Sequence, residues 1–122
     1  MFNVENYSGS KQKDYELVIK QLRALSEGES NTIANLANAS ALLNQFLNEV
    51  NWVGFYLMED GELVLGPFQG LPACIRIPLG KGVCGTSAAK RETIIVPDVT
   101  THVASTTVAV GAGGGAGAGL TV

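Results

Sequence analysis

Two cysteines, Cys74 and Cys84, are the residues of this 122-residue chain best suited to redox chemistry. A thiolate can attack the sulfur of a sulfoxide, and a second thiol can then resolve the resulting sulfenic acid as a disulfide. We expect Cys84 near the N-terminal end of a helix and close to Lys81, both of which would lower its thiol pKa. Cys74 lies across a Gly-containing turn and could reach bridging distance. The alternative is that both cysteines are small buried hydrophobic residues.

An aromatic pair, Trp52 and Tyr56, stands four residues apart in a run rich in aromatic and branched residues. On a strand the two side chains would share one face, and such a pair suits a pocket for a thioether-like side chain. Taken alone, two aromatic residues on a strand more often pack in the core. Asp98 follows the apolar run at 93–96, where it stands either at the rim of such a pocket or as the cap of a turn.

Other chemistries fit the spacing poorly. Gly80-Lys81 lacks the first glycine and the final Ser or Thr of a phosphate loop. Gly85-Thr-Ser87-Ala-Ala89 lacks the last glycine of a nucleophile elbow. Cys74, Cys84 and His102 match no common zinc spacing, so we expect no metal and no cofactor.

Two amphipathic helices are expected before the cysteines. Apolar side chains recur at spacings of three and four from Ser10 to Glu27 and again from Ile33 to Val50. Ser30 is the expected cap of the second helix, with Glu27 and Glu29 near its positive end.

Short strands are expected around the cysteines. Asp60-Gly61 predicts a tight hairpin between strands at 51–58 and 62–66, and the pattern then breaks at 68–72. A strand at 74–78, a short helix closing on Lys90 and Arg91, and a buried strand at 93–96 stopped by Pro97 follow. The order predicts an α+β fold, an antiparallel sheet with the two N-terminal helices packed on one face.

The central stretch resembles the free methionine-(R)-sulfoxide reductases, small enzymes built as a single GAF domain. The resemblance is carried by residues 51–56, 65–70, 72–74, 77–78, 80–85 and 96–99. It implies a GAF-like fold and an oxidoreductase that reduces free methionine-(R)-sulfoxide through redox-active cysteines and a disulfide, recharged by a thioredoxin-like reductant. It assigns Trp52 and Tyr56 to the substrate, and Cys74 and Cys84 to the redox chemistry.

The chain departs from this family at the principal nucleophile. The family has a third cysteine after a His-aliphatic-Ala run, and here that run reads His102-Val103-Ala104-Ser105. Ser105 cannot form a sulfenic acid, so we expect weak activity. The alternative function is a non-catalytic GAF module that binds or responds to a small molecule.

Composition bounds the partners and the extent of the domain. The net charge of −3 lacks the basic face that nucleic acids require. No apolar run is long enough for a membrane span, and residues 1–10 lack a signal-peptide core, so we expect a cytoplasmic protein. A homodimer is compatible with the sequence. Residues 1–110 are interpreted as the GAF-like domain, and the Gly/Ala-rich residues 111–122 as a truncated or unreliable end of it, with strands at 106–110 and 120–122 fitting a hairpin.

Overall fold

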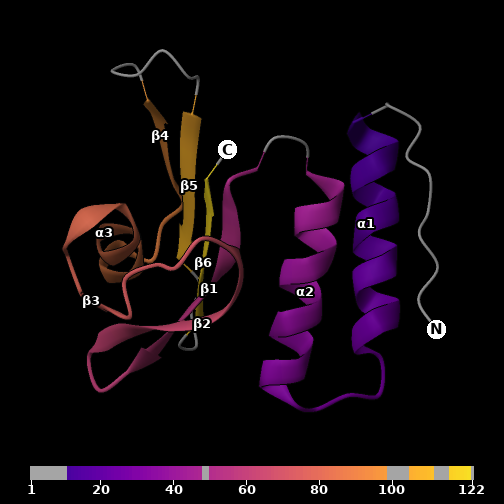
Figure 1. The fold of residues 1–122 in the computed structure, drawn as a ribbon, viewed down its shortest axis with the longest axis horizontal. Coiled ribbons are helices and arrows are strands. Elements are labelled where there is room, and N and C mark those ends of the chain that lie inside the picture. Colours follow the sequence, from indigo (N-terminus) through magenta and orange to yellow (C-terminus); the bar gives the residue numbers. More distant parts are fainter. Residues whose placement is uncertain (1–10, 48–49, 99–104, 112–115, 122) are drawn as a thin grey trace.

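Three helices and six strands are formed by the residues that the computed structural model describes, which are 11–47, 50–98, 105–111 and 116–121 (Figure 1). The helices are α1 (Lys11–Ser26), α2 (Thr32–Phe46) and α3 (Gly82–Lys90). The strands are β1 (Trp52–Glu59), β2 (Glu62–Gly70), β3 (Arg76–Pro78), β4 (Ile94–Asp98), β5 (Ser105–Gly111) and β6 (Ala116–Thr121). Every strand pairing is antiparallel, and the strand order is β3-β2-β1-β6-β5-β4.

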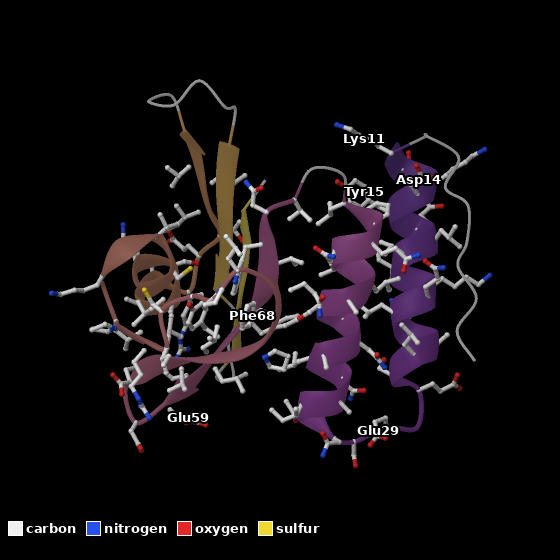
Figure 2. The ribbon with its side chains drawn as sticks, viewed as in Figure 1. Lys11, Asp14, Tyr15, Glu29, Glu59 and Phe68 are labelled. Carbon is white, nitrogen blue, oxygen red and sulfur yellow. The ribbon has the colours of Figure 1, made fainter. Side chains whose placement is uncertain are left out.

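The two N-terminal helices lie on one side of the sheet, and α3 lies on the other (Figure 1). α2 contacts β1 and β2 directly, whereas α1 packs on the outer side of α2. At one end of this helix pair the ring of Tyr15 meets that of Phe46 edge to face, with ring centroids 5.2 Å apart (Figure 2). The α+β fold with the helices on one face is therefore confirmed. None of the described helices is long and apolar enough to cross a bilayer.

The start of α2 differs by one residue from the prediction. Asn31 is the N-cap in place of Ser30, because its extended backbone lets its side chain accept the N–H of Ala34 at 2.9 Å. The Glu29 carboxylate accepts the N–H of Asn31 at 3.0 Å, which places its negative charge at the positive end of the helix.

The β1–β2 hairpin turns at Asp60-Gly61, as predicted. Both residues have positive φ, 49° and 81°, which is the requirement of a two-residue type I′ turn. β2 then runs to Gly70, so the expected break at 68–72 is wrong at its start. A bulge allows the strand to continue, because Gly66 and Pro67 together stand opposite Phe55. Proline is tolerated there since a bulge leaves one residue out of the ladder.

The edge strand β4 corrects two further expectations. Pro97 lies within β4, paired with Thr106, and does not stop it, because an edge strand can spare an N–H on its open side. Ile95 is 64% exposed and Val96 39% exposed, so the predicted burial of this strand is wrong. β4 has a paired strand on one side only, so less of its surface is covered than in a central strand.

The Gly/Ala-rich end of the chain occupies the middle of the sheet. β6 pairs with β1 on one side and with β5 on the other. The hairpin expected from strands near 106–110 and 120–122 is present, with β6 beginning earlier, at Ala116. The division of the domain into residues 1–110 and a truncated or unreliable end at 111–122 stays a prediction; Ala116–Thr121 of that end form β6 in the same sheet.

The turn geometry predicts the effect of replacing Gly61. Gly61→Ala should lower the free energy of unfolding by roughly 1–2 kcal/mol, because a Cβ disfavours the left-handed conformation. Apart from Gly61 itself and its two chain neighbours, no residue has an atom within 4 Å of that Cβ, so a steric clash would not contribute. Urea unfolding of the two proteins measures the difference. Gly61→Asn is the matched control and should lose less, since Asn tolerates positive φ; equal losses in both variants would contradict this explanation.

Candidate functional site

Three stacked aromatic rings form the centre of the candidate site. The ring centroids of Trp52 and Tyr56 are 5.9 Å apart with their planes at 27°, and those of Trp52 and Phe68 are 5.4 Å apart at 19°. Trp52 and Tyr56 come from β1, and Phe68 comes from β2, where Figure 2 labels it near the middle of the molecule. The predicted same-face pair is thus in contact. Phe68 was not among the predicted site residues.

Gly54 allows the rings to come together. It stands between Trp52 and Tyr56 on their face of β1, and it pairs with Phe68 across the sheet. A Cβ on Gly54 would lie 2.2 Å from Cβ of Phe68 and 2.9 Å from Cη2 of Trp52, closer than atoms can approach. Only glycine leaves room for both rings above this position.

The β2 bulge brings Phe68 to this face. In a regular ladder with Leu65 opposite Tyr56, Pro67 would oppose Gly54 and Phe68 would lie on the other face of the sheet. The fully buried Ser40 of α2 secures the bulge, because its hydroxyl contacts the Pro67 carbonyl at 3.0 Å and the Leu36 carbonyl at 2.9 Å. A helix on the opposite side of the sheet therefore helps to set the geometry of the aromatic cluster.

The Tyr56 hydroxyl connects the aromatic cluster to the two thiols. It donates a hydrogen bond of 2.8 Å to the Cys74 carbonyl, and only 5% of the residue is exposed. Burial raises the pKa of Tyr56, and negative charge on Cys84 and on Cys74 raises it further. Both thiols are therefore within electrostatic range of this hydroxyl. Whether they reach bridging distance of each other stays a prediction.

The two cysteines differ in environment. Cys84 is the third residue of α3 and is half-buried, whereas Cys74 lies in the β2–β3 connection and is exposed; both are free thiols. Burial raises the pKa of the Cys84 thiol, so the expected lowering by the helix end and Lys81 is wrong. Lys81 precedes this nine-residue helix and is exposed, and its side chain makes no capping hydrogen bond. Removal of the thiolate from water outweighs these weaker attractions.

The N-terminal end of α3 is packed tightly on β3. A Cβ on Gly85 would lie 2.6 Å from the Pro78 carbonyl oxygen, so glycine is required for this close approach. The Gly80 N–H donates to the Gly85 carbonyl at 2.9 Å, which ties the preceding loop to the helix. Glycines at these positions hold Cys84 next to the sheet face that carries Tyr56.

The other predicted site residues lie on β4 and β5 or outside the described residues. Ser105 is the first residue of β5, and its backbone pairs with Asp98 of β4. Its role beside the two cysteines stays a prediction, as does the choice between pocket rim and turn cap for Asp98. His102, which was considered as a third metal ligand, lies outside the described residues.

An antiparallel sheet with two N-terminal helices on one face and a short helix on the other defines a GAF-type domain. A solved structure described as that of the GAF domain is 35% identical with a TM-score of 0.79, and the match covers 95% of this chain and 77% of that one. No protein-family profile matches the chain.

More specific similarities follow. The free methionine-R-sulfoxide reductase of Escherichia coli is 50% identical over 90 residues, 74% of this chain and 54% of that protein. The fRMsr of Staphylococcus aureus, solved in complex with substrate, is 40% identical with a TM-score of 0.78, covering 98% of this chain and 82% of that one. The chain therefore belongs to the free methionine-(R)-sulfoxide reductase family. It spans about half to three fifths of the length of the curated relatives it matches.

The contact between Gly54 and Phe68 predicts a local effect of substitution. Gly54→Ala should lower the free energy of unfolding by about 1–3 kcal/mol and shift the fluorescence emission of Trp52, the sole tryptophan, because the added methyl group forces the rings apart. Val53→Ala is the matched control, because Val53 is buried on the opposite face of the same strand. It should destabilise the protein without shifting the emission. The same emission shift in both variants would contradict a local effect.

The thiol environments predict unequal alkylation. At neutral pH iodoacetamide should modify Cys74 faster than Cys84, because Cys84 is half-buried and its raised pKa leaves less thiolate. The rate at Cys84 should keep rising above the ordinary cysteine pKa of about 8.5. Peptide mass spectrometry over a pH series gives both rates, and the Cys84→Ser variant isolates the reaction of Cys74. Faster modification of Cys84 at neutral pH would overturn this assignment.

Proposed function

We propose that this chain binds free methionine-(R)-sulfoxide and reduces it to methionine by thiol and disulfide chemistry. The observation that carries the proposal is the position of Tyr56, whose ring stacks on Trp52 and whose hydroxyl lies within electrostatic range of Cys74 and Cys84. Tyr56 therefore borders both an apolar surface for the substrate side chain and the two thiols. Membership of the family supports this reaction, because the E. coli relative is named a free methionine-R-sulfoxide reductase.

The aromatic cluster suits the methyl end of the substrate. Sulfur and its attached methyl group pack favourably on aromatic rings, and the cluster offers the rings of Trp52, Tyr56 and Phe68 on one face of the sheet. Because the proposed substrate is a free amino acid, the site needs no groove to hold a polypeptide. We infer that the sulfoxide sulfur is thereby held near the thiols.

The reaction needs two thiols for each sulfoxide. The Cys84 thiolate attacks the sulfoxide sulfur, and the substrate S–O bond breaks as the oxygen passes to the Cys84 sulfur. With one proton taken up, the products are methionine and a sulfenic acid on Cys84. The Cys74 thiol then condenses with the sulfenic acid, which forms the disulfide and releases water. A thioredoxin-like dithiol restores both thiols by exchange and becomes oxidised itself. The exposed Cys74 sulfur is the accessible one for that exchange.

This chemistry suits the cytoplasm, where thiols are kept reduced, and we propose that location. A homodimer stays a prediction.

A second function is a GAF module that binds the ligand without turnover. Two observations favour it: position 105 carries Ser where the family has its nucleophilic cysteine, and burial raises the pKa of the Cys84 thiol, which reduces the thiolate available at neutral pH. Binding by the aromatic cluster would be retained in this case.

Substitution at position 105 separates the two functions. The chain as it stands should reduce free methionine-(R)-sulfoxide slowly, and Ser105→Cys should raise the rate by orders of magnitude, because a thiolate replaces a hydroxyl that stays protonated. Thioredoxin-coupled NADPH oxidation measures the rate.

Two control variants make this test specific. Thr106→Cys places the same thiol one residue further along β5 and should give little gain. Cys84→Ser should abolish the slow activity of the unmodified chain. Full activity with Ser at position 105, unchanged by Cys, would show that the nucleophile lies elsewhere. Ligand binding with no turnover in either protein would favour the non-catalytic module.

A further inference from the structure

The exposed thiol lies between two exposed apolar side chains. Cys74 is in the β2–β3 connection, and Leu71 and Ile75 on either side of it in the chain are 81% and 67% exposed. A large aliphatic side chain that faces water forgoes the free energy that its burial would provide. Exposed apolar side chains that gather at one place on a protein indicate a surface that a partner covers. Here they gather at a thiol.

Hydrogen bonds fix the backbone at this thiol. The Tyr56 hydroxyl donates to the Cys74 carbonyl at 2.8 Å, and the Leu65 N–H donates to the Ile75 carbonyl at 2.8 Å. Two successive carbonyl groups are therefore tied to β1 and β2, which restricts the peptide planes beside both residues. The exposure of Cys74 and Ile75 is thus set by the fold.

The surface around Cys74 offers little free charge. Arg76 is the one charged residue from 71 to 79, and its guanidinium binds the Glu62 carboxylate at 2.6 Å. A small anionic thiol such as glutathione is bound mainly through its carboxylates, which require cationic partners. A protein with apolar surface around its own reactive cysteine fits this neighbourhood better, because contact removes both apolar surfaces from water.

We propose that Leu71 and Ile75 form the docking surface for a dithiol protein of the thioredoxin type that reduces this chain. This inference rests on the proposed function and names where its reductant binds. Exchange passes through a mixed disulfide, so the partner's sulfur must come within bonding distance of the Cys74 sulfur. The side chains flanking Cys74 are then covered by the partner. Leu71 and Ile75 are the large exposed apolar side chains among them.

The exchange balances with the partner as its only reductant. One partner thiolate attacks the Cys74 sulfur of the Cys74–Cys84 disulfide, the S–S bond breaks, and Cys84 leaves as a thiolate that takes up a proton. The partner's second thiol loses its proton and attacks the partner sulfur of the mixed disulfide. Cys74 leaves as a thiolate and takes up a proton. The partner ends as a disulfide, and its electron pair has reduced this chain to two thiols.

A label on Cys74 tests docking in the absence of any sulfoxide. In the Cys84→Ser chain, dithionitrobenzoate converts Cys74 into a mixed disulfide with thionitrobenzoate. A thiolate that attacks the Cys74 sulfur releases coloured thionitrobenzoate, and its absorbance gives the rate. Reduced thioredoxin is the protein probe, and reduced glutathione is the small probe that needs no docking surface.

Two substitutions remove the apolar contacts. Leu71→Ser and Ile75→Thr, each made in the Cys84→Ser chain, should slow release by thioredoxin about tenfold and leave release by glutathione unchanged. Both residues are exposed, so neither change removes packing in the core. Ile95→Thr is the matched control, because Ile95 is 64% exposed on β4, at the opposite edge of the sheet from β3. It should slow neither probe.

Two results would overturn the docking surface. One is an unchanged thioredoxin rate in both substituted chains. The other is an equal loss with thioredoxin and glutathione, which would show an effect on the thiol itself. A loss of the same size in Ile95→Thr would contradict the proposal as well, because it would show that the position of the apolar side chain is unimportant.

The proposed reduction is checked separately, with dithiothreitol in place of a protein reductant. Turnover of free methionine-(R)-sulfoxide with dithiothreitol, together with thioredoxin rates that ignore Leu71 and Ile75, would end this inference alone. No turnover with dithiothreitol would end the proposed reduction. The exchange rates at Cys74 would still decide the docking surface in that case, because they contain no sulfoxide step.

Discussion

The close approach of Phe68 to Gly54 is the contact on which the candidate site depends. Backbone and side chain meet there with no space for even a methyl group, and the stacked rings of Trp52 and Tyr56 lie directly beside it. Packing of this density allows one arrangement of the rings, because any added atom would displace one of them. The absence of a side chain at Gly54 is therefore as necessary for the site as the three aromatic rings.

The opposite face of the sheet supports this contact. Ser40 lies fully buried on α2, and its hydroxyl reaches the Pro67 carbonyl at the bulge that turns Phe68 toward Trp52. A hydroxyl has one proton, so the Pro67 and Leu36 carbonyls share it. The helix layer and the aromatic face are therefore linked through two adjacent residues of β2. This link explains why a helix without reactive groups matters to the site.

Burial governs the electrostatics of the two thiols. The end of a helix and a nearby lysine would both favour a thiolate at Cys84, yet each acts weakly where water can reach the charge. The half-buried position of Cys84 removes part of the water that would stabilise the thiolate, and its pKa rises. Burial also raises the pKa of Tyr56, which keeps its hydroxyl protonated and able to donate to the Cys74 carbonyl.

The sequence by itself determined the local features. Helical periods predicted α1 and α2, Asp60-Gly61 predicted the tight hairpin turn, and the spacing of Trp52 and Tyr56 predicted their shared face. Each of these depends on backbone preferences or on the two-residue period of a strand, which act over a few neighbouring residues. The motifs around the cysteines were equally local, and they were sufficient to indicate the family.

Only the tertiary structure decided the rest. Phe68 joins the site because a bulge changes the register of β2, and register depends on a partner strand. β6 lies at the centre of the sheet and β4 at its edge, which reversed the burial expected for Ile95. The pKa of Cys84 and the hydrogen bond of the Tyr56 hydroxyl depend on what surrounds each atom. Desolvation and hydrogen-bond satisfaction are properties of the packed chain, so no run of neighbouring residues could reveal them.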